Sequence, residues 1–263
     1  SNVDYPIVGY YFGEAALGVY KLAYEIVLEP VRVISHVVAD IAFPTFAKLR
    51  HDRERLVAQF ISFTRLNLVT VMTFSAIVFV GAGDLLAVAF PKYQAATDAI
   101  RVLCIVAVLR SVSFVIPPML DGVGFPNRTF VYMLVAAITL PATFLLGANL
   151  LGDQFGDERG FLSVAVAWAV GYPIAFVVLV VIALYTLELS RLRFLRAVIG
   201  VPVCTVVATV AGLLAGAALA GQPASLRLAI TTAVVLATTA WLLAYTQGLS
   251  VRGALRALRG ETS

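Results

Sequence analysis

Long apolar stretches follow one another along this chain, with only short polar breaks between them. We place these stretches at residues 15–46, 54–82, 95–121, 128–150, 160–188, 195–220 and 226–248. About 20 helical residues suffice to cross the hydrocarbon core of a bilayer, and a spanning helix satisfies its own backbone hydrogen bonds. The sequence therefore predicts an all-α integral membrane protein, a helical bundle of seven transmembrane helices. Residues 1–13 are expected to form the end of a preceding, truncated transmembrane helix.

The composition supports a membrane protein and excludes several other classes. Hydrophobic residues make up 61% of the chain and charged residues only 13%, whereas about a quarter of a soluble domain is charged. This excludes a soluble enzyme, a nucleic-acid-binding protein and a disordered chain. The two cysteines, Cys104 and Cys204, each lie inside an apolar stretch, and no H-E-x-x-H motif occurs, so we expect no metal, no other cofactor and no metalloprotease chemistry.

Basic residues collect at every second break, which predicts the orientation in the membrane. The opposite breaks hold only Lys92, Arg159 and Arg227 among their basic residues, together with Asp84, Asp153, Asp157 and Glu158. Because cytoplasmic loops carry the excess of Lys and Arg, the basic ends are expected to be cytoplasmic, and so is the C-terminus. The residues at these basic ends are Lys48, Arg50, Arg53, Arg55, Arg128, Arg191, Arg193, Arg196, Arg252, Arg256 and Arg259.

Ionisable residues inside the stretches are concentrated in the first three. In the first stretch they fall within an arc of about 100° on one helix face. We call these six residues the charged stripe: Lys21, Glu25, Glu29, Arg32, His36 and Asp40. A charge at the centre of a membrane helix costs about 2.5–3.5 kcal/mol on insertion scales, so contact of the stripe with lipid is disfavoured. The stripe is therefore expected to line a water-filled cavity, or to form a lattice of ion pairs such as Lys21–Glu25 and His36–Asp40.

Arginines at membrane depth suggest the kind of ligand such a cavity takes. Arg110 and Arg32 are each near the middle of their stretches, and Arg65 lies about three turns into the second. A guanidinium group suits phosphate because its planar donors grip two oxygens at once. We therefore expect Arg32 and Arg110, with Lys21 and Arg65, to bind an anionic substrate. Arg101 is expected instead to pair with Asp98 or to reach the interface.

A seam of small residues recurs at four-residue spacing in the sixth stretch. Its members are Ala208, Gly212, Gly216 and Ala220. Small residues let two helix backbones approach closely in a membrane. We expect this seam to be a site of close helix packing.

Several motifs in the first half of the chain resemble a known family. They are DYPIVGYYFG at residues 4–13, ALGVYKLAY at 16–24, Pro30, FPTF at 43–46, DRERL at 52–56 and LDGVGFP at 120–126. This pattern is similar to the opening of the second half of polysaccharide-repeat (Wzx-type) flippases, within the multidrug/oligosaccharidyl-lipid/polysaccharide exporter superfamily. The similarity extends over roughly residues 4–128 and is only a matter of hydropathy beyond.

The resemblance implies a transporter rather than an enzyme. Such flippases have two pseudo-symmetric lobes and move undecaprenyl-pyrophosphate-linked oligosaccharides across the bacterial inner membrane by alternating access. The chain would then be a C-terminal lobe whose N-terminal lobe is missing, with the lipid-linked oligosaccharide, bilayer lipids and the polysaccharide assembly machinery as partners. Residues 14–128 would line the cavity, residues 129–248 would form an apolar scaffold, and residues 249–263 would be a basic cytoplasmic tail.

Acidic residues in the first stretch depart from the family pattern and leave the mechanism open. Glu25 and Glu29 stand where relatives more often carry neutral or basic residues. This suggests that transport is coupled to proton exchange by Glu25, Glu29, His36 and Asp40. A lipid II flippase or a cation-coupled multidrug exporter of the same superfamily, or a structural lobe that transports nothing, are the alternatives. A glycosyltransferase or polymerase is disfavoured because no outer break is long enough to carry a catalytic domain.

Overall fold

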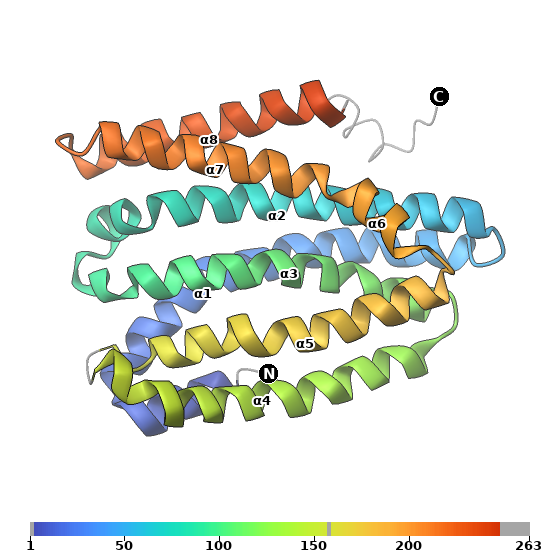
Figure 1. Cartoon of the computed structure of the whole chain (residues 1–263), viewed down its shortest axis with the longest axis horizontal. Helices are drawn as coiled ribbons and strands as arrows, with labels where there is room; N and C mark the ends of the chain where they lie inside the picture. The colour runs from blue at the N-terminus through green and yellow to red at the C-terminus, as the bar shows by residue number, and fades with distance from the viewer. Residues whose placement is uncertain (1–2, 157–158, 248–263) are drawn as a thin grey trace.

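The computed structural model describes residues 3–156 and 159–247, and this part of the chain is helical without any strand (Figure 1). Seven long helices follow one another, with a 3-10 turn before the third and a short helix before the last two. They are α1 (Asp4–Lys48), α2 (Arg53–Ala89), η1 (Pro91–Ala96), α3 (Thr97–Gly122), α4 (Pro126–Phe155), α5 (Leu162–Thr186), α6 (Arg191–Val198), α7 (Gly200–Ala218) and α8 (Ala224–Gln247).

Each predicted stretch coincides with one of these long helices. Among the described residues, six helical segments are long and apolar enough to cross a membrane. Helix α1, which carries the charged stripe, is not one of these six. The predicted fold class, an all-α membrane protein, is confirmed.

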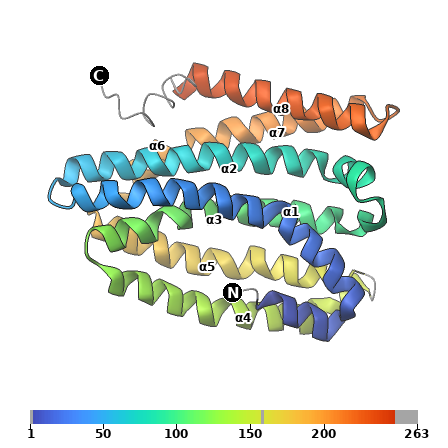
Figure 2. The same ribbon diagram turned by 180° about the vertical axis from the view of Figure 1, so that it is seen from behind.

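Helix α1 is divided at Gly13 rather than at the proline in its middle. Gly13 has φ +81° and ψ 175°, a conformation that is essentially restricted to glycine. The piece before Gly13 turns back toward α4 and α5, while the longer piece crosses over α3 (Figure 2). Phe12 then lies against Gly152 and Gly160. The chain keeps helical dihedral angles through Pro30.

The helices pack around α3, which lies between α1, α2 and α5. Helix α4 packs against α5, and the α7–α8 pair packs against α2. At one end of this pair, Arg227 donates from Nε to both carboxylate oxygens of Asp84, each at 2.8 Å, and so ties α8 to α2. Two large apolar clusters form the interior. One lies around α3 and α5, and the other lies around the C-terminal end of α1 and the N-terminal half of α2.

The basic breaks lie together at one end of the bundle. Loops 49–52, 123–125 and 187–190 are at the right of Figure 1, and residues 159–161 and loop 219–223 are at the left with η1. The LDGVGFP motif forms the turn between α3 and α4, where Gly124 has φ +91° and Phe125 N–H donates to the Leu120 carbonyl at 2.8 Å. We call the end of the bundle that carries loops 49–52, 123–125 and 187–190 the basic end. Arg252, Arg256 and Arg259, with the rest of the tail 249–263, lie outside the described residues, as do Asp157 and Glu158.

The small-residue seam is a close helix contact, as predicted. A Cβ on Gly212 would lie 2.5 Å from Val235 Cγ2 of α8 and 3.2 Å from Val80 Cγ2 of α2. A Cβ on Gly216 would meet only Thr231 Cγ2, at 3.4 Å. The seam therefore sets the approach of α7 to both of its neighbours at Gly212, and to α8 alone at Gly216.

Gly212→Ala is expected to lower the free energy of unfolding by about 1–3 kcal/mol, because the methyl group overpacks a contact with two branched side chains. Gly216→Ala is the matched control, since it makes the same gain in helix propensity at ordinary contact distance. Thermal unfolding of the intact protein in detergent measures the difference. Equal midpoints for the two variants would contradict the proposed packing.

Candidate functional site

The charged stripe lies on the outer face of α1, turned away from α3 except at His36. Lys21 and Glu25 keep 55% and 51% of their side chains exposed, and Arg32 keeps 50%. His36 and Asp40 are exposed as well, while the opposite face, with Val27, Leu28 and Val31, is buried. Within the described residues, the stripe is thus neither sealed in a dry contact nor covered by another helix.

Ion pairs within α1 join some members of the stripe. Lys21 Nζ lies 3.7 Å from Glu25 Oε1, which is the pair predicted from their spacing. Arg32 donates to Glu29 Oε2 from Nε at 2.9 Å and from Nη2 at 2.6 Å. The ring of His36 instead meets Phe114 of α3 edge-on, with 5.3 Å between centroids. Because these pairs are exposed, each contributes little to stability, and the cations in them remain accessible to a ligand.

Arg110 sits in a different environment, enclosed by aromatic rings between α1, α3 and α5. Its Cζ is 5.2 Å from the centroid of the Trp168 ring and 5.9 Å from that of Phe114. Its Nη1 donates to the hydroxyl of Tyr24 at 3.4 Å, and the phenols of Tyr132 and Tyr172 are close by. The aromatic faces stabilise the guanidinium through cation–π attraction. In this conformation Arg110 is enclosed and Arg32 is exposed, so the two do not form one open binding site.

The other arginines differ in their surroundings. Arg65 is half-buried on α2 and interacts with neighbouring protein groups. Arg101 lies 3.9 Å from Asp98, the partner expected from the sequence. Asp98 also has Arg159 within 3.7 Å, so it is shared between α3 and the start of α5.

A buried polar network next to Arg110 was not found by sequence reasoning. Asp4 is fully buried and accepts hydrogen bonds at Oδ2 from the Tyr20 hydroxyl at 2.7 Å and from Trp168 Nε1 at 3.3 Å. Trp168 Nε1 also lies 3.0 Å from the Tyr20 hydroxyl. The ring of Trp168 therefore contacts Arg110 on its face and the carboxylate of Asp4 at its edge. The only signal in the sequence was the polar residue at the start of an apolar helix, two residues before Pro6.

A second buried polar contact joins the three charged helices. Asn67 of α2 donates from Nδ2 to the Ser35 hydroxyl of α1 at 3.1 Å and to the Ser111 carbonyl of α3 at 2.7 Å. Hydrogen bonds of this kind hold membrane helices together because the alternative is an unsatisfied polar group in an apolar interior. They fix α1 relative to α2 and α3 with the stripe turned outward.

Comparison with known proteins agrees with the resemblance seen in the motifs. The family described as "Polysaccharide biosynthesis protein" matches residues 1–96. The teichuronic acid biosynthesis protein TuaB of Bacillus subtilis is 37% identical over 42% of this chain and 23% of its own length. The amylovoran biosynthesis protein AmsL of Erwinia amylovora is 31% identical over 52% of this chain and 36% of its own length.

A third relative extends the similarity further along the chain. The lipopolysaccharide biosynthesis protein WzxC of Escherichia coli is 24% identical over 63% of this chain and 34% of its own length. The chain thus spans about a quarter to a third of the length of these curated relatives. No solved structure gives a significant match. The predicted resemblance to Wzx-type polysaccharide proteins is confirmed, and the chain is a multi-pass membrane protein similar to proteins of polysaccharide biosynthesis.

Tyr20→Phe is expected to lower the free energy of unfolding by about 1–3 kcal/mol, because it removes a donor to Asp4 and leaves a buried carboxylate short of hydrogen bonds. Thermal unfolding of the intact protein in detergent measures this loss. Tyr10→Phe is the control, since Tyr10 is on the same helix and is 86% exposed. A Tyr20→Phe variant as stable as Tyr10→Phe would show that the network contributes nothing.

Proposed function

We propose that this chain is the C-terminal lobe of a flippase that carries undecaprenyl-pyrophosphate-linked oligosaccharides across the bacterial inner membrane. The match of residues 1–96 to a polysaccharide biosynthesis family, and the names of three relatives, support a role in making or exporting a cell-surface polysaccharide. Transport, rather than catalysis, is supported by the physical problem that such a substrate poses. A pyrophosphate and its hydrated sugars do not cross hydrocarbon unaided.

The exposed charged stripe is the observation that carries this proposal. From Lys21 to Asp40 the stripe extends about 28 Å along α1, which is close to the thickness of the hydrocarbon core. Every charge in it would cost several kcal/mol against lipid. The stripe must therefore face water or another protein surface. A water-filled passage between this lobe and an N-terminal lobe satisfies that requirement along the whole helix.

Within such a passage the cations bind the anionic part of the substrate. Arg32 and Lys21 are exposed on the passage face, and among the described residues each is paired with a carboxylate on its own helix. A pyrophosphate replaces these carboxylates as the partner, and the planar donors of Arg32 grip two of its oxygens. Arg110 adds positive charge from behind α1. Arg65 on α2 is assigned to the same group of cations.

The carboxylates of the stripe then serve a second purpose. When the substrate takes the cations, Glu25 and Glu29 lose their ion-pair partners and are left to exchange protons instead. His36 and Asp40 continue the line of exchangeable groups toward the basic end, which we assign to the cytoplasm with the C-terminus. Exchange of protons along α1 thus couples substrate binding to the change between inward-facing and outward-facing states.

Arg32→Gln is expected to lower export of the polymer at least tenfold, because the variant loses a bidentate contact to pyrophosphate. Arg110→Gln is expected to lower export as well. Polymer at the cell surface is measured by gel and sugar analysis, and the amount of protein in the membrane by immunoblot. Normal export by an Arg32→Gln variant present at normal levels would remove Arg32 from the site.

Two further variants separate binding from helix stability. Glu29→Gln breaks the same ion pair as Arg32→Gln but keeps the cation, so it is expected to retain substrate binding. If the ion pair itself were what matters, both variants would lose substrate binding equally. Arg101→Gln removes a membrane-embedded arginine that pairs with Asp98, and it is expected to leave export unchanged.

A further inference from the structure

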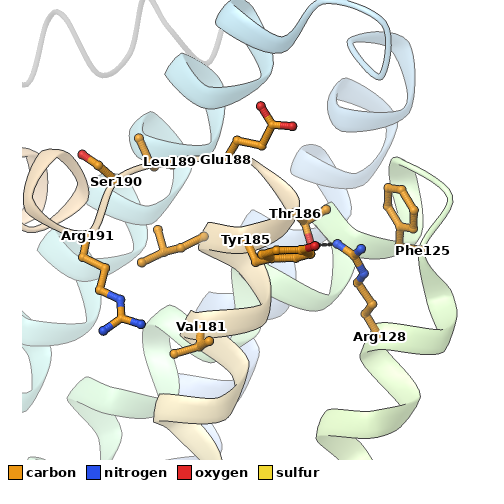
Figure 3. A pocket seen from close by; sticks show the side chains of 10 residues that line it. Phe125, Arg128, Val181, Tyr185, Thr186, Glu188, Leu189, Ser190 and Arg191 are labelled. Atoms are coloured by element: carbon orange, nitrogen blue, oxygen red, sulfur yellow. Dashed lines mark hydrogen bonds between the residues drawn. The ribbon is translucent and has the colours of Figure 1, made fainter.

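A hollow of about 710 Å³ opens at the basic end, between α4, α5 and the start of α6. Figure 3 shows the end of α5 at its centre, with Arg128 on one side and Arg191 on the other. The remaining lining is aromatic, aliphatic and hydroxyl-bearing, with one acidic residue, Glu188. This hollow is remote from the charged stripe along the chain and on different helices, and neither the proposed transport step nor the family resemblance uses it.

Arg128 is held in place by its neighbours and still offers donors to the hollow. Its Cζ is 4.4 Å from the centroid of the Phe125 ring and 5.3 Å from that of Tyr185. Its Nη1 donates to the Thr186 hydroxyl at 2.5 Å, as Figure 3 shows. A guanidinium has five N–H donors, and this bond uses one of them. Arg128 is therefore a preorganised cation with unused donors, which lowers the entropic cost of binding an anion.

The acidic residue in the lining is compensated from outside the hollow. Glu188 forms an ion pair with Arg53 of α2, and Arg53 also donates to the carbonyls of Leu187 at 3.1 Å and Glu188 at 2.9 Å. Glu188 lies just after the end of α5 and has φ +45°. Leu189 N–H donates to the Leu184 carbonyl at 2.9 Å and closes this helix end. With Glu188 neutralised in this way, Arg128 and the exposed Arg191 leave the hollow positively charged.

Apolar surface continues from the hollow toward the middle of the bundle. Tyr185 and Val181 of α5 are exposed on it, and Val177, one turn further along the same face of α5, is exposed as well. Only 11% of the most apolar 18-residue stretch of α4 is buried inside the protein, so most of the surface of this helix is left for lipid. A ligand that fits this arrangement has an anionic head at the end of the bundle and hydrocarbon chains along α4 and α5.

We propose that this hollow binds the phosphate headgroup of an anionic phospholipid of the surrounding bilayer. Basic pockets between membrane helices bind such headgroups because the phosphate pairs with arginine at the depth where the interface lies. Arg128 holds the phosphate, Arg191 supplies the second positive charge, and the acyl chains lie on the exposed apolar faces. This assignment depends on the charge and the geometry of the hollow alone, and it stands whether or not the chain is a flippase.

The test is binding of phosphatidylglycerol to the intact protein purified in detergent, followed by thermal unfolding and by native mass spectrometry. Phosphatidylglycerol is expected to raise the unfolding midpoint more than phosphatidylcholine with the same acyl chains. Arg128→Gln and Arg191→Gln are each expected to weaken the apparent affinity about five- to tenfold. Arg196→Gln is the matched control, since it removes the same charge from α6 at an exposed position outside the hollow.

Three outcomes would overturn the proposal. The first is an equal loss of affinity in Arg196→Gln, which would indicate attraction by the general charge of the basic end. The second is equal stabilisation by phosphatidylcholine, which would indicate contact with acyl chains alone. The third is full stabilisation by inorganic phosphate, which would assign the hollow to a soluble anion. Because Arg191 is exposed, Arg191→Gln tests the site even if Arg128→Gln fails to fold.

Discussion

The cost of placing charge in hydrocarbon is the constraint on which the rest of this structure depends. Apolar helices satisfy it by their composition, and α4 and α8 turn most of their surface outward without penalty. Helix α1 does not satisfy it alone, because a line of ionisable residues runs along its exposed face. The protein therefore needs water or a second protein surface beside α1, and this need is the physical basis for assigning a transport passage there.

Cations are handled in three ways in this bundle. Arg32 pairs with a carboxylate one turn away on its own helix, Arg110 is enclosed by aromatic rings, and Arg227 forms a two-oxygen contact with Asp84 across helices. The first leaves the cation accessible and easily exchanged, whereas the last fixes two helices relative to each other. Function is expected where the partner can be replaced, and this distinguishes the face of α1 from the rest of the bundle.

Much of the fold could be predicted because membrane helices are specified by local composition. The seven stretches, the turn at Gly124 and the close contact at Gly212 each follow from residues within a short segment. The kink was less predictable. Proline is the residue that usually interrupts a helix, but α1 keeps helical dihedral angles through Pro30 and leaves them at Gly13, where a positive φ lets the first piece pack on α4 and α5. The candidate site was only partly predictable as well, because the packing between helices decides which of its residues lie together.

The sequence by itself determined that six ionisable residues share one face of α1, because helical periodicity needs no knowledge of the neighbours. It also determined which breaks are basic. Only the tertiary structure decided that this face is turned away from α3, that Arg110 is enclosed by Trp168 and Tyr24, and that Asp4 is buried against Tyr20. Those contacts join residues up to 86 positions apart, and they depend on how helices pack, which no local pattern encodes.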